Sequence, residues 1–135
     1  EAIDKIVSVC DNVFYEPNLG LESFAEILSA CHIFAGNSSA GIIEAPSFGC
    51  HVVNIGSRQR NRECSARVVH VNNNSGRQLD LELIQLFKEL LRAPRAKPKP
   101  DSNPYFRENS ERLAYEFLLR MDFNQCEVKE FYDEK

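Results

Sequence analysis

Residues 32–44 decide the fold, and they read HIFAGNSSAGIIE. The first five are apolar almost throughout, which predicts a strand that is covered on both faces. Small residues follow from Ser38 to Gly41, and they predict the start of a helix that reaches about Phe48. Pro46 should bend or shorten this helix, and Gly49 is well placed to end it. A strand that turns directly into a helix is typical of an α/β sheet.

The rest of the chain repeats this alternation of short β-branched runs and longer helical patterns. We predict strands at 13–15, 32–36, 51–55 and 67–71, and helices at 1–9, 21–31, 39–48 and 81–91. Asp80 is the expected N-cap of the helix at 81–91. The predicted fold class is therefore α/β, a Rossmann-like, three-layer domain with a parallel sheet of about four strands. In such sheets ligands bind beyond the carboxyl ends of the strands.

The chain divides into three predicted parts. Residues 1–92 form a partial Rossmann-like domain, and residues 93–103 form a Pro- and Lys-rich connector that cannot be helical. Residues 104–135 hold a last helix and an acidic tail, with Asn103 and Pro104 as the N-cap and first position of that helix. Because a helical pattern begins with the first residues, we expect the sequence to be a piece of a longer protein.

Composition narrows the class of partner. The net charge of −4 argues against nucleic acid, because neutralising phosphates needs a basic face. No apolar run is long enough to span a bilayer and the first residues do not resemble a secretory leader, so we expect no membrane and a cytoplasmic location. The 5 cysteines are widely spaced, odd in number and without a CxxC pair, which indicates free thiols. We expect no metal and no cofactor.

The turn after the strand at 32–36 holds the first candidate binding residues. Small side chains leave backbone N–H groups open, and Ser38 and Ser39 add hydroxyls, so an anion such as a diphosphate fits. Glu44 is too far along for a capping box and can accept hydrogen bonds from the vicinal hydroxyls of a sugar. An ordinary capped helix with a surface glutamate explains these residues equally well. The candidates of this turn are Asn37, Ser38, Ser39, Gly41 and Glu44.

A second loop with unusual chemistry follows the strand at 51–55. Residues 56–62 read GSRQRNR, and Arg58 and Arg60 could clamp phosphate oxygens with their guanidinium groups. Arg58 is the stronger candidate because it lies nearest the end of the strand, and Arg62 is interpreted as a surface residue. A solvated basic loop is the alternative.

No catalytic residue is predicted. His51 and His70 lie in predicted strands, and we interpret them as packing or capping residues because no positioned partner can be identified. Cys64 lies near the basic loop, a setting that can activate a thiol, but we interpret it as incidental. The turn at 36–44 is neither a Walker loop, nor GxGxxG, nor a GxSxG elbow.

Residues 37–49, followed by residues 53–60, resemble the C-terminal domain of UDP-N-acetylglucosamine 2-epimerases. The likeness is greatest to the hydrolysing branch, which makes N-acetylmannosamine and UDP for sialic-acid-type pathways, and to relatives that act on bacillosamine-type sugars. It extends backward through residues 15–24 and, more weakly, forward to Asn103-Pro104-Tyr105.

The resemblance has departures. His51 stands where the family usually has Pro, and Asn61 stands where Gly is common. Residues 106–109 replace the Gly-Asp-Gly that usually follows Asn-Pro-Tyr, which puts the path of the last helix in doubt.

The resemblance implies the C-terminal half of a GT-B fold, in which two Rossmann-like domains hold a nucleotide sugar between them. Ser38 and Ser39 match the pair that holds the diphosphate, Glu44 matches the carboxylate on the ribose hydroxyls, and Arg58 matches an arginine that lines the site. The family's acid/base carboxylates and its key histidine lie upstream of the matched segment. We therefore expect this chain to bind UDP or UDP-N-acetylglucosamine, to be inactive alone, and to pair with a missing N-terminal domain or form a homo-oligomer.

Two other functions stay open. The chain could be a stand-alone, non-catalytic nucleotide-sugar-binding or interaction module. It could also be half of a GT-B glycosyltransferase, a class that shares the glutamate-to-ribose contact but rarely the Gly-Asn-Ser-Ser run.

Overall fold

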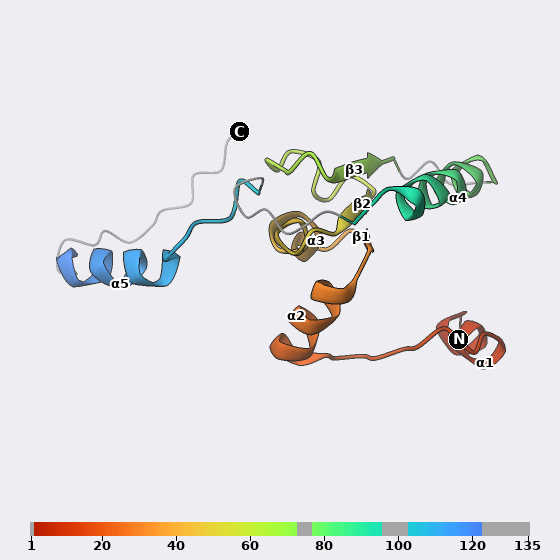
Figure 1. The fold of residues 1–135 in the computed structure, drawn as a ribbon, viewed down its shortest axis with the longest axis horizontal. Helices are drawn as coiled ribbons and strands as arrows, with labels where there is room; N and C mark the ends of the chain where they lie inside the picture. The colour runs from red at the N-terminus through yellow and green to blue at the C-terminus, as the bar shows by residue number, and fades with distance from the viewer. Residues whose placement is uncertain (1, 73–76, 96–102, 123–135) are drawn as a thin grey trace, which may run out of the picture.

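The structure is a computed structural model that describes residues 2–72, 77–95 and 103–122 of the chain (Figure 1). Helices and strands alternate through the middle of the chain, as expected for an α/β fold. The elements are α1 (Ala2–Val9), α2 (Gly20–Ala30), β1 (Ile33–Gly36), α3 (Ser39–Ile43), the 3-10 helix η1 (Ala45–Phe48), β2 (His51–Ile55), β3 (Val68–Val71), α4 (Arg77–Arg92) and α5 (Ser110–Arg120).

The sheet has three parallel strands in the order β1-β2-β3. Ile33 lies opposite His51 at the start of the first pair, and Ile55 lies opposite Val71 at the end of the second. All carboxyl ends therefore lie at one edge of the sheet, and all amino ends lie at the other. The predicted α/β class with a parallel, Rossmann-like sheet is confirmed, as are the strands predicted around β1, β2 and β3.

The strand predicted at 13–15 is wrong, so the sheet has three described strands where we predicted about four. These residues are irregular, and the Val13 N–H donates to the carbonyl of Cys10 across a turn (3.2 Å). Phe14 is 88% exposed. Three β-branched or aromatic residues do not form a strand without a neighbouring strand to pair with.

The core lies where α2 and η1 meet the middle strand. Leu28, Ala45, Cys50 and Val52 are buried together, and the partly buried rings of Phe24 and Phe34 pack beside them. Helix α3 lies very close to the sheet at Gly41, where an added Cβ would come within 2.8 Å of the Phe34 ring. Only glycine permits that approach without a shift of the ring.

The predicted break in the helix at 39–48 is confirmed. Helix α3 ends at Ile43, Pro46 lies in η1, and Gly49 ends η1 with a positive φ of 82°. Proline lacks the N–H that a continued α-helix needs, and glycine adopts the left-handed conformation without a Cβ penalty.

Two predicted helix starts are wrong. Helix α4 begins at Arg77, so Asp80 lies inside its first turn, where a carboxylate still suits the helix dipole. Helix α5 begins only at Ser110, after Asn109 in the left-handed region, so Asn103 and Pro104 are not its cap and first position. Asn103 instead bonds to residues far away in sequence.

The terminal helices leave apolar side chains in solvent. Figure 1 shows α1 and α5 lying apart from the sheet, and the expected apolar face of α5 is exposed at Leu113, Phe117 and Leu118. Within the described residues, no helix is both long enough and apolar enough to cross a membrane. Most of the predicted connector, residues 96–102, and the predicted acidic tail from Asn124 lie outside the described residues.

Candidate functional site

The first loop of the candidate site leaves the carboxyl end of β1. Ser38 is the N-cap of α3, and its hydroxyl accepts a hydrogen bond from the Ala40 N–H (3.3 Å). Asn37 and Ser38 are exposed, and Ser39 is half-buried as the first residue of α3. The predicted turn of small residues is therefore open to solvent, with a hydroxyl and a free helix start at its surface.

Gly41 has a different position. It is buried on the sheet side of α3, against Phe34 and Val52. Its small size serves the contact between helix and sheet, so its place in the structure is explained by packing.

Glu44 lies at the other end of α3. Its N–H donates to the Ala40 carbonyl (2.9 Å), and its carbonyl accepts from the Ser47 N–H (2.9 Å), which fixes the backbone on both sides. Its side chain is exposed. Among the described residues, no hydrogen bond or ion pair is recorded for this carboxylate, so it is available to a ligand.

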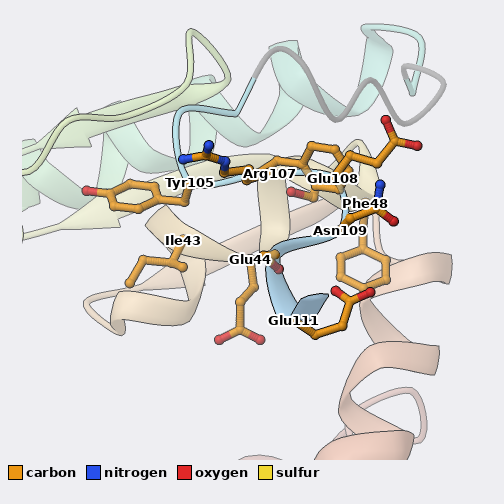
Figure 2. A pocket seen from close by; sticks show the side chains of 11 residues that line it. Ile43, Glu44, Phe48, Tyr105, Arg107, Glu108, Asn109 and Glu111 are labelled. Atoms are coloured by element: carbon orange, nitrogen blue, oxygen red, sulfur yellow. The ribbon is translucent and has the colours of Figure 1, made fainter. Parts of the chain in front are cut away.

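A cavity of about 490 Å³ opens beside Glu44. It is lined by Ile43, Glu44, Ser47 and Phe48 on one side and by residues 105–111 on the other. Figure 2 shows Glu44 on the helix side and Tyr105 and Arg107 on the facing segment. The cavity thus combines aromatic rings with charges of both signs.

The second loop of the candidate site leaves the carboxyl end of β2. Gly56 donates its N–H to the carbonyl of Val71 (2.8 Å), and a turn follows in which the Arg60 N–H donates to the Ser57 carbonyl (3.0 Å). Arg58 is exposed and has no recorded hydrogen bond or ion pair within the described residues. Arg60 is also exposed, but its guanidinium donates to the side-chain oxygen of Asn72. Of the two predicted phosphate-binding arginines, Arg58 is the unengaged one.

Gln59 joins the two loops, and sequence reasoning missed it. It is only 3% exposed, and its amide nitrogen donates to the backbone carbonyl of Asn37 (3.1 Å). This bond brings the Arg58–Arg60 turn against the turn that begins α3. Glutamine in a basic loop gives no sequence signal of burial, because its partner lies 22 residues away.

Asn103 is the second residue that sequence reasoning misplaced. It is 2% exposed, and its amide nitrogen donates to the Ile43 carbonyl (2.8 Å) and to the Ser47 hydroxyl (2.6 Å). Its side-chain oxygen accepts from the Tyr105 N–H (3.2 Å). Asn103 therefore holds the 105–111 wall of the cavity against the junction of α3 and η1 that carries Glu44.

The described groups with shifted pKa values lie away from both loops. Burial, aided by nearby Cys31, raises the pKa of Cys50 to about 11. Burial, together with Arg67 and His32, holds the pKa of His51 below its ordinary value. His51 opens β2 and Cys50 directly precedes it, so both belong to the amino edge of the sheet. Within the described residues, no group of three or more His, Cys, Asp or Glu side chains could hold a metal ion.

Comparison with known families tests the resemblance directly. A family described as UDP-N-acetylglucosamine 2-epimerase matches residues 1–119, which is most of the chain. The chain belongs to this family. The matched region includes both loops of the candidate site and the Asn103 segment.

Curated relatives share this family relationship. A UDP-N,N'-diacetylbacillosamine 2-epimerase (hydrolyzing) of Legionella pneumophila is 51% identical over 49 residues, covering 36% of this chain and 13% of that protein. A UDP-N-acetylglucosamine 2-epimerase of Neisseria meningitidis serogroup B is 38% identical over 56 residues, covering 42% and 15%. The polysialic acid biosynthesis protein P7 of Escherichia coli is 34% identical over 104 residues, covering 73% and 24%. The chain thus spans at most about a quarter of the length of these relatives.

Proposed function

We propose that this chain forms the UDP-binding part of a UDP-N-acetylglucosamine 2-epimerase of the hydrolysing type, the type that yields N-acetylmannosamine and UDP. The observation that supports this most is the bond between Gln59 and the Asn37 carbonyl (3.1 Å). It joins two loops at the carboxyl edge of a parallel sheet, which is where α/β proteins bind nucleotides. The family relationship supports a nucleotide sugar as the ligand at that edge.

The diphosphate binds at the joined loops. Ser38 and Ser39 offer hydroxyls and helix-start N–H groups, and Arg58 offers a guanidinium that no described residue engages. An arginine fork pairs well with phosphate oxygens, and a helix start favours negative charge. Asn37 and Arg60 support these groups, since Asn37 accepts from Gln59 and Arg60 bonds Asn72.

The ribose binds at Glu44. Its carboxylate is exposed at the rim of the cavity, on a backbone segment that is fixed at both ends. A carboxylate accepts two hydrogen bonds at once, which suits the vicinal hydroxyls of a ribose. Glu44 thus binds the ribose hydroxyls, while Arg58 neutralises the charge of the diphosphate.

The chemical step needs groups that these residues do not supply. Elimination of UDP from the sugar requires positioned acid and base groups, and neither loop contains a side chain placed for that work. We propose that the N-terminal domain of the whole enzyme supplies them, and that the enzyme works in the cytoplasm. The chain by itself should therefore release no UDP from UDP-N-acetylglucosamine.

A titration with UDP tests the proposal. Calorimetry or fluorescence should give weak binding for the wild-type chain, and Glu44→Ala and Arg58→Ala should each weaken it about tenfold, the loss of one good polar contact. Arg62→Ala is the matched control for Arg58, and Glu26→Ala, an exposed carboxylate on α2, is the control for Glu44. Equal affinities in all five proteins would remove the proposed site.

A further inference from the structure

Cys64 lies in the segment that leads from the basic loop to β3, and it has an unusual neighbour. Its sulfur is 3.6 Å from Nε2 of His70, a residue of β3 that is exposed to solvent. Cys64 is half-buried, so a small molecule can reach it. A ring nitrogen at this distance can form a hydrogen bond with the sulfur, and the thiolate is the form of cysteine that reacts.

The imidazole is held in place from its other side. Nδ1 of His70 lies 2.9 Å from the side-chain nitrogen of Asn54, which is directly opposite in the β2–β3 register. Asn54 is 1% exposed, and the same nitrogen donates to the Gly56 carbonyl (3.3 Å). We assign the amide with its nitrogen towards the Gly56 carbonyl, because the reversed amide would place two oxygens together. In this orientation the buried Oδ1 of Asn54 has no partner among the described residues.

This orientation fixes the proton on the ring. Because the Asn54 nitrogen donates to Nδ1, the neutral imidazole carries its hydrogen on Nε2. Nε2 is the atom that faces the sulfur of Cys64. His70 thus presents an N–H to Cys64, and a hydrogen bond from that donor stabilises a thiolate at this position.

From this Asn54–His70–Cys64 chain of contacts we propose that Cys64 is a thiol-exchange site that reacts with small-molecule disulfides. The Cys64 thiol loses its proton to solvent, and the thiolate, held by the Nε2–H of His70, attacks one sulfur of the disulfide. The old S–S bond breaks, a mixed disulfide forms on Cys64, and the other half leaves as a thiolate that takes up a proton. One disulfide and one thiol are consumed, and one disulfide and one thiol are formed.

The other described cysteines lack this setting. Cys50 is buried, and its sulfur donates to the Leu28 carbonyl (3.3 Å), which favours the protonated thiol. The Cys31 sulfur donates to the Ile33 carbonyl (2.9 Å), so its partner is a backbone oxygen and not a side-chain donor. Cys10 is half-buried, and within the described residues its thiol has no recorded hydrogen-bond partner. Cys10 is therefore the internal reference against which Cys64 can be compared.

Oxidised glutathione is a suitable probe. The full chain is incubated with it at pH 7, and peptide mapping by mass spectrometry follows the mixed disulfide at each cysteine. Cys64 should react about tenfold faster than Cys10, since the Nε2–H of His70 faces the attacking sulfur of Cys64 and Cys10 has no recorded hydrogen-bond partner within the described residues. A Cys64 that reacts no faster than Cys10 overturns the proposal.

Substitution of the histidine separates activation from exposure. His70→Ala should lower the rate at Cys64 to that of Cys10, while Cys10 itself is unchanged and Cys50 stays unreactive, which shows that the fold is retained. An unchanged Cys64 rate in this variant contradicts the role of the imidazole. If the variant unfolds, the test is the ratio of the reaction rates of Cys64 and Cys10 in the wild-type chain. Cys64→Ser should remove the fast adduct.

An adduct on Cys64 would follow directly after the loop of Arg58 and Arg60. Weaker UDP binding in the modified protein is the expected consequence, and it rests on the proposed function. The exchange reaction itself does not, because its test contains no nucleotide.

Discussion

The two edges of the sheet carry similar polar side chains and use them in opposite ways. At the amino edge, Nε2 of His32 lies 2.9 Å from the Leu90 carbonyl and 3.1 Å from the Ala93 carbonyl. Arg95 donates to the carbonyls of Leu28, Ser29 and Phe48. These side chains donate to backbone carbonyls at the ends of α2, η1 and α4.

In the loops that leave the carboxyl edge and at the far end of α3, the same kinds of charge stay exposed. Within the described residues, neither Arg58 nor the Glu44 carboxylate has a recorded partner, and Ser38 bonds only to its own helix. The loops are held by buried amides instead, Gln59 on one side and Asn103 on the other. The comparison teaches that similar charges have different roles: at the amino edge they bind backbone carbonyls, and at Arg58 and Glu44 they stay unengaged on a backbone held by buried amides, which is why we propose the binding site there.

Asn103→Ala should have the largest effect on stability. It should also weaken UDP binding, although Asn103 itself is not proposed to contact the ligand. The change removes the three hydrogen bonds of a buried amide and takes away the side-chain donor to the Ile43 carbonyl, a loss of about 3 kcal/mol. Urea unfolding measures it. Because Asn103 holds the segment that carries Glu44, UDP affinity should fall as well.

The neighbouring Tyr105→Phe is the matched control, since it removes one exposed hydroxyl from the same segment. It should change stability by less than about 0.5 kcal/mol. An Asn103→Ala protein as stable as this control would show that the hydrogen bonds of Asn103 do not stabilise the fold.

Arg95→Ala should have the next largest effect, and it sharpens the comparison. Three carbonyls lose a charged donor, but the site is exposed and water can replace part of the loss, so we expect about 1–2 kcal/mol. Arg58→Ala should leave the unfolding midpoint unchanged and weaken only UDP binding. If Arg95→Ala and Arg58→Ala changed stability and UDP affinity alike, the proposed division into a structural amino edge and a binding carboxyl edge would be contradicted.

The pH dependence of His51 should give the smallest effect. Its pKa lies below 6.5 because burial, Arg67 and His32 disfavour its charged form. As the pH falls below 6.5, the unfolded chain takes up the proton first, so stability is lost until the folded-state pKa is reached. Above pH 6.5 the effect is absent. From about pH 7.5 to 5.5, the urea midpoint should fall less for His51→Gln than for the wild type. An equal fall in both proteins would show that His51 does not cause the pH dependence.

Much of the fold was predictable from sequence because it depends on local patterns. Strands β1, β2 and β3 are apolar runs of the kind that buried parallel strands require, and Pro46 with Gly49 marks the break after α3. The run at 13–15 has the same local pattern but no partner strand, so it stays irregular. Pairing is a property of the whole chain, and three residues do not reveal it.

The candidate site was predictable in its exposed residues and not in its supports. Ser38 and Arg58 stand out because they follow strand ends, and Glu44 stands out because it is a carboxylate on the helix that Ser38 begins. The structure leaves all three exposed. Gln59 and Asn103 act through buried bonds to backbone atoms 22 and 60 residues away. No local pattern announces such bonds, and Asn103 was misread as a helix cap because asparagine before proline is common at helix starts.

The central claim is that UDP binds at the carboxyl edge of the sheet. Amide resonances of the isotope-labelled chain, followed by NMR during a UDP titration, test it most directly. The account predicts shifts at residues 37–41, 44 and 56–60, with none at His32, His51 or Arg95. Shifts confined to the amino edge, or no shifts at saturating UDP, would contradict it.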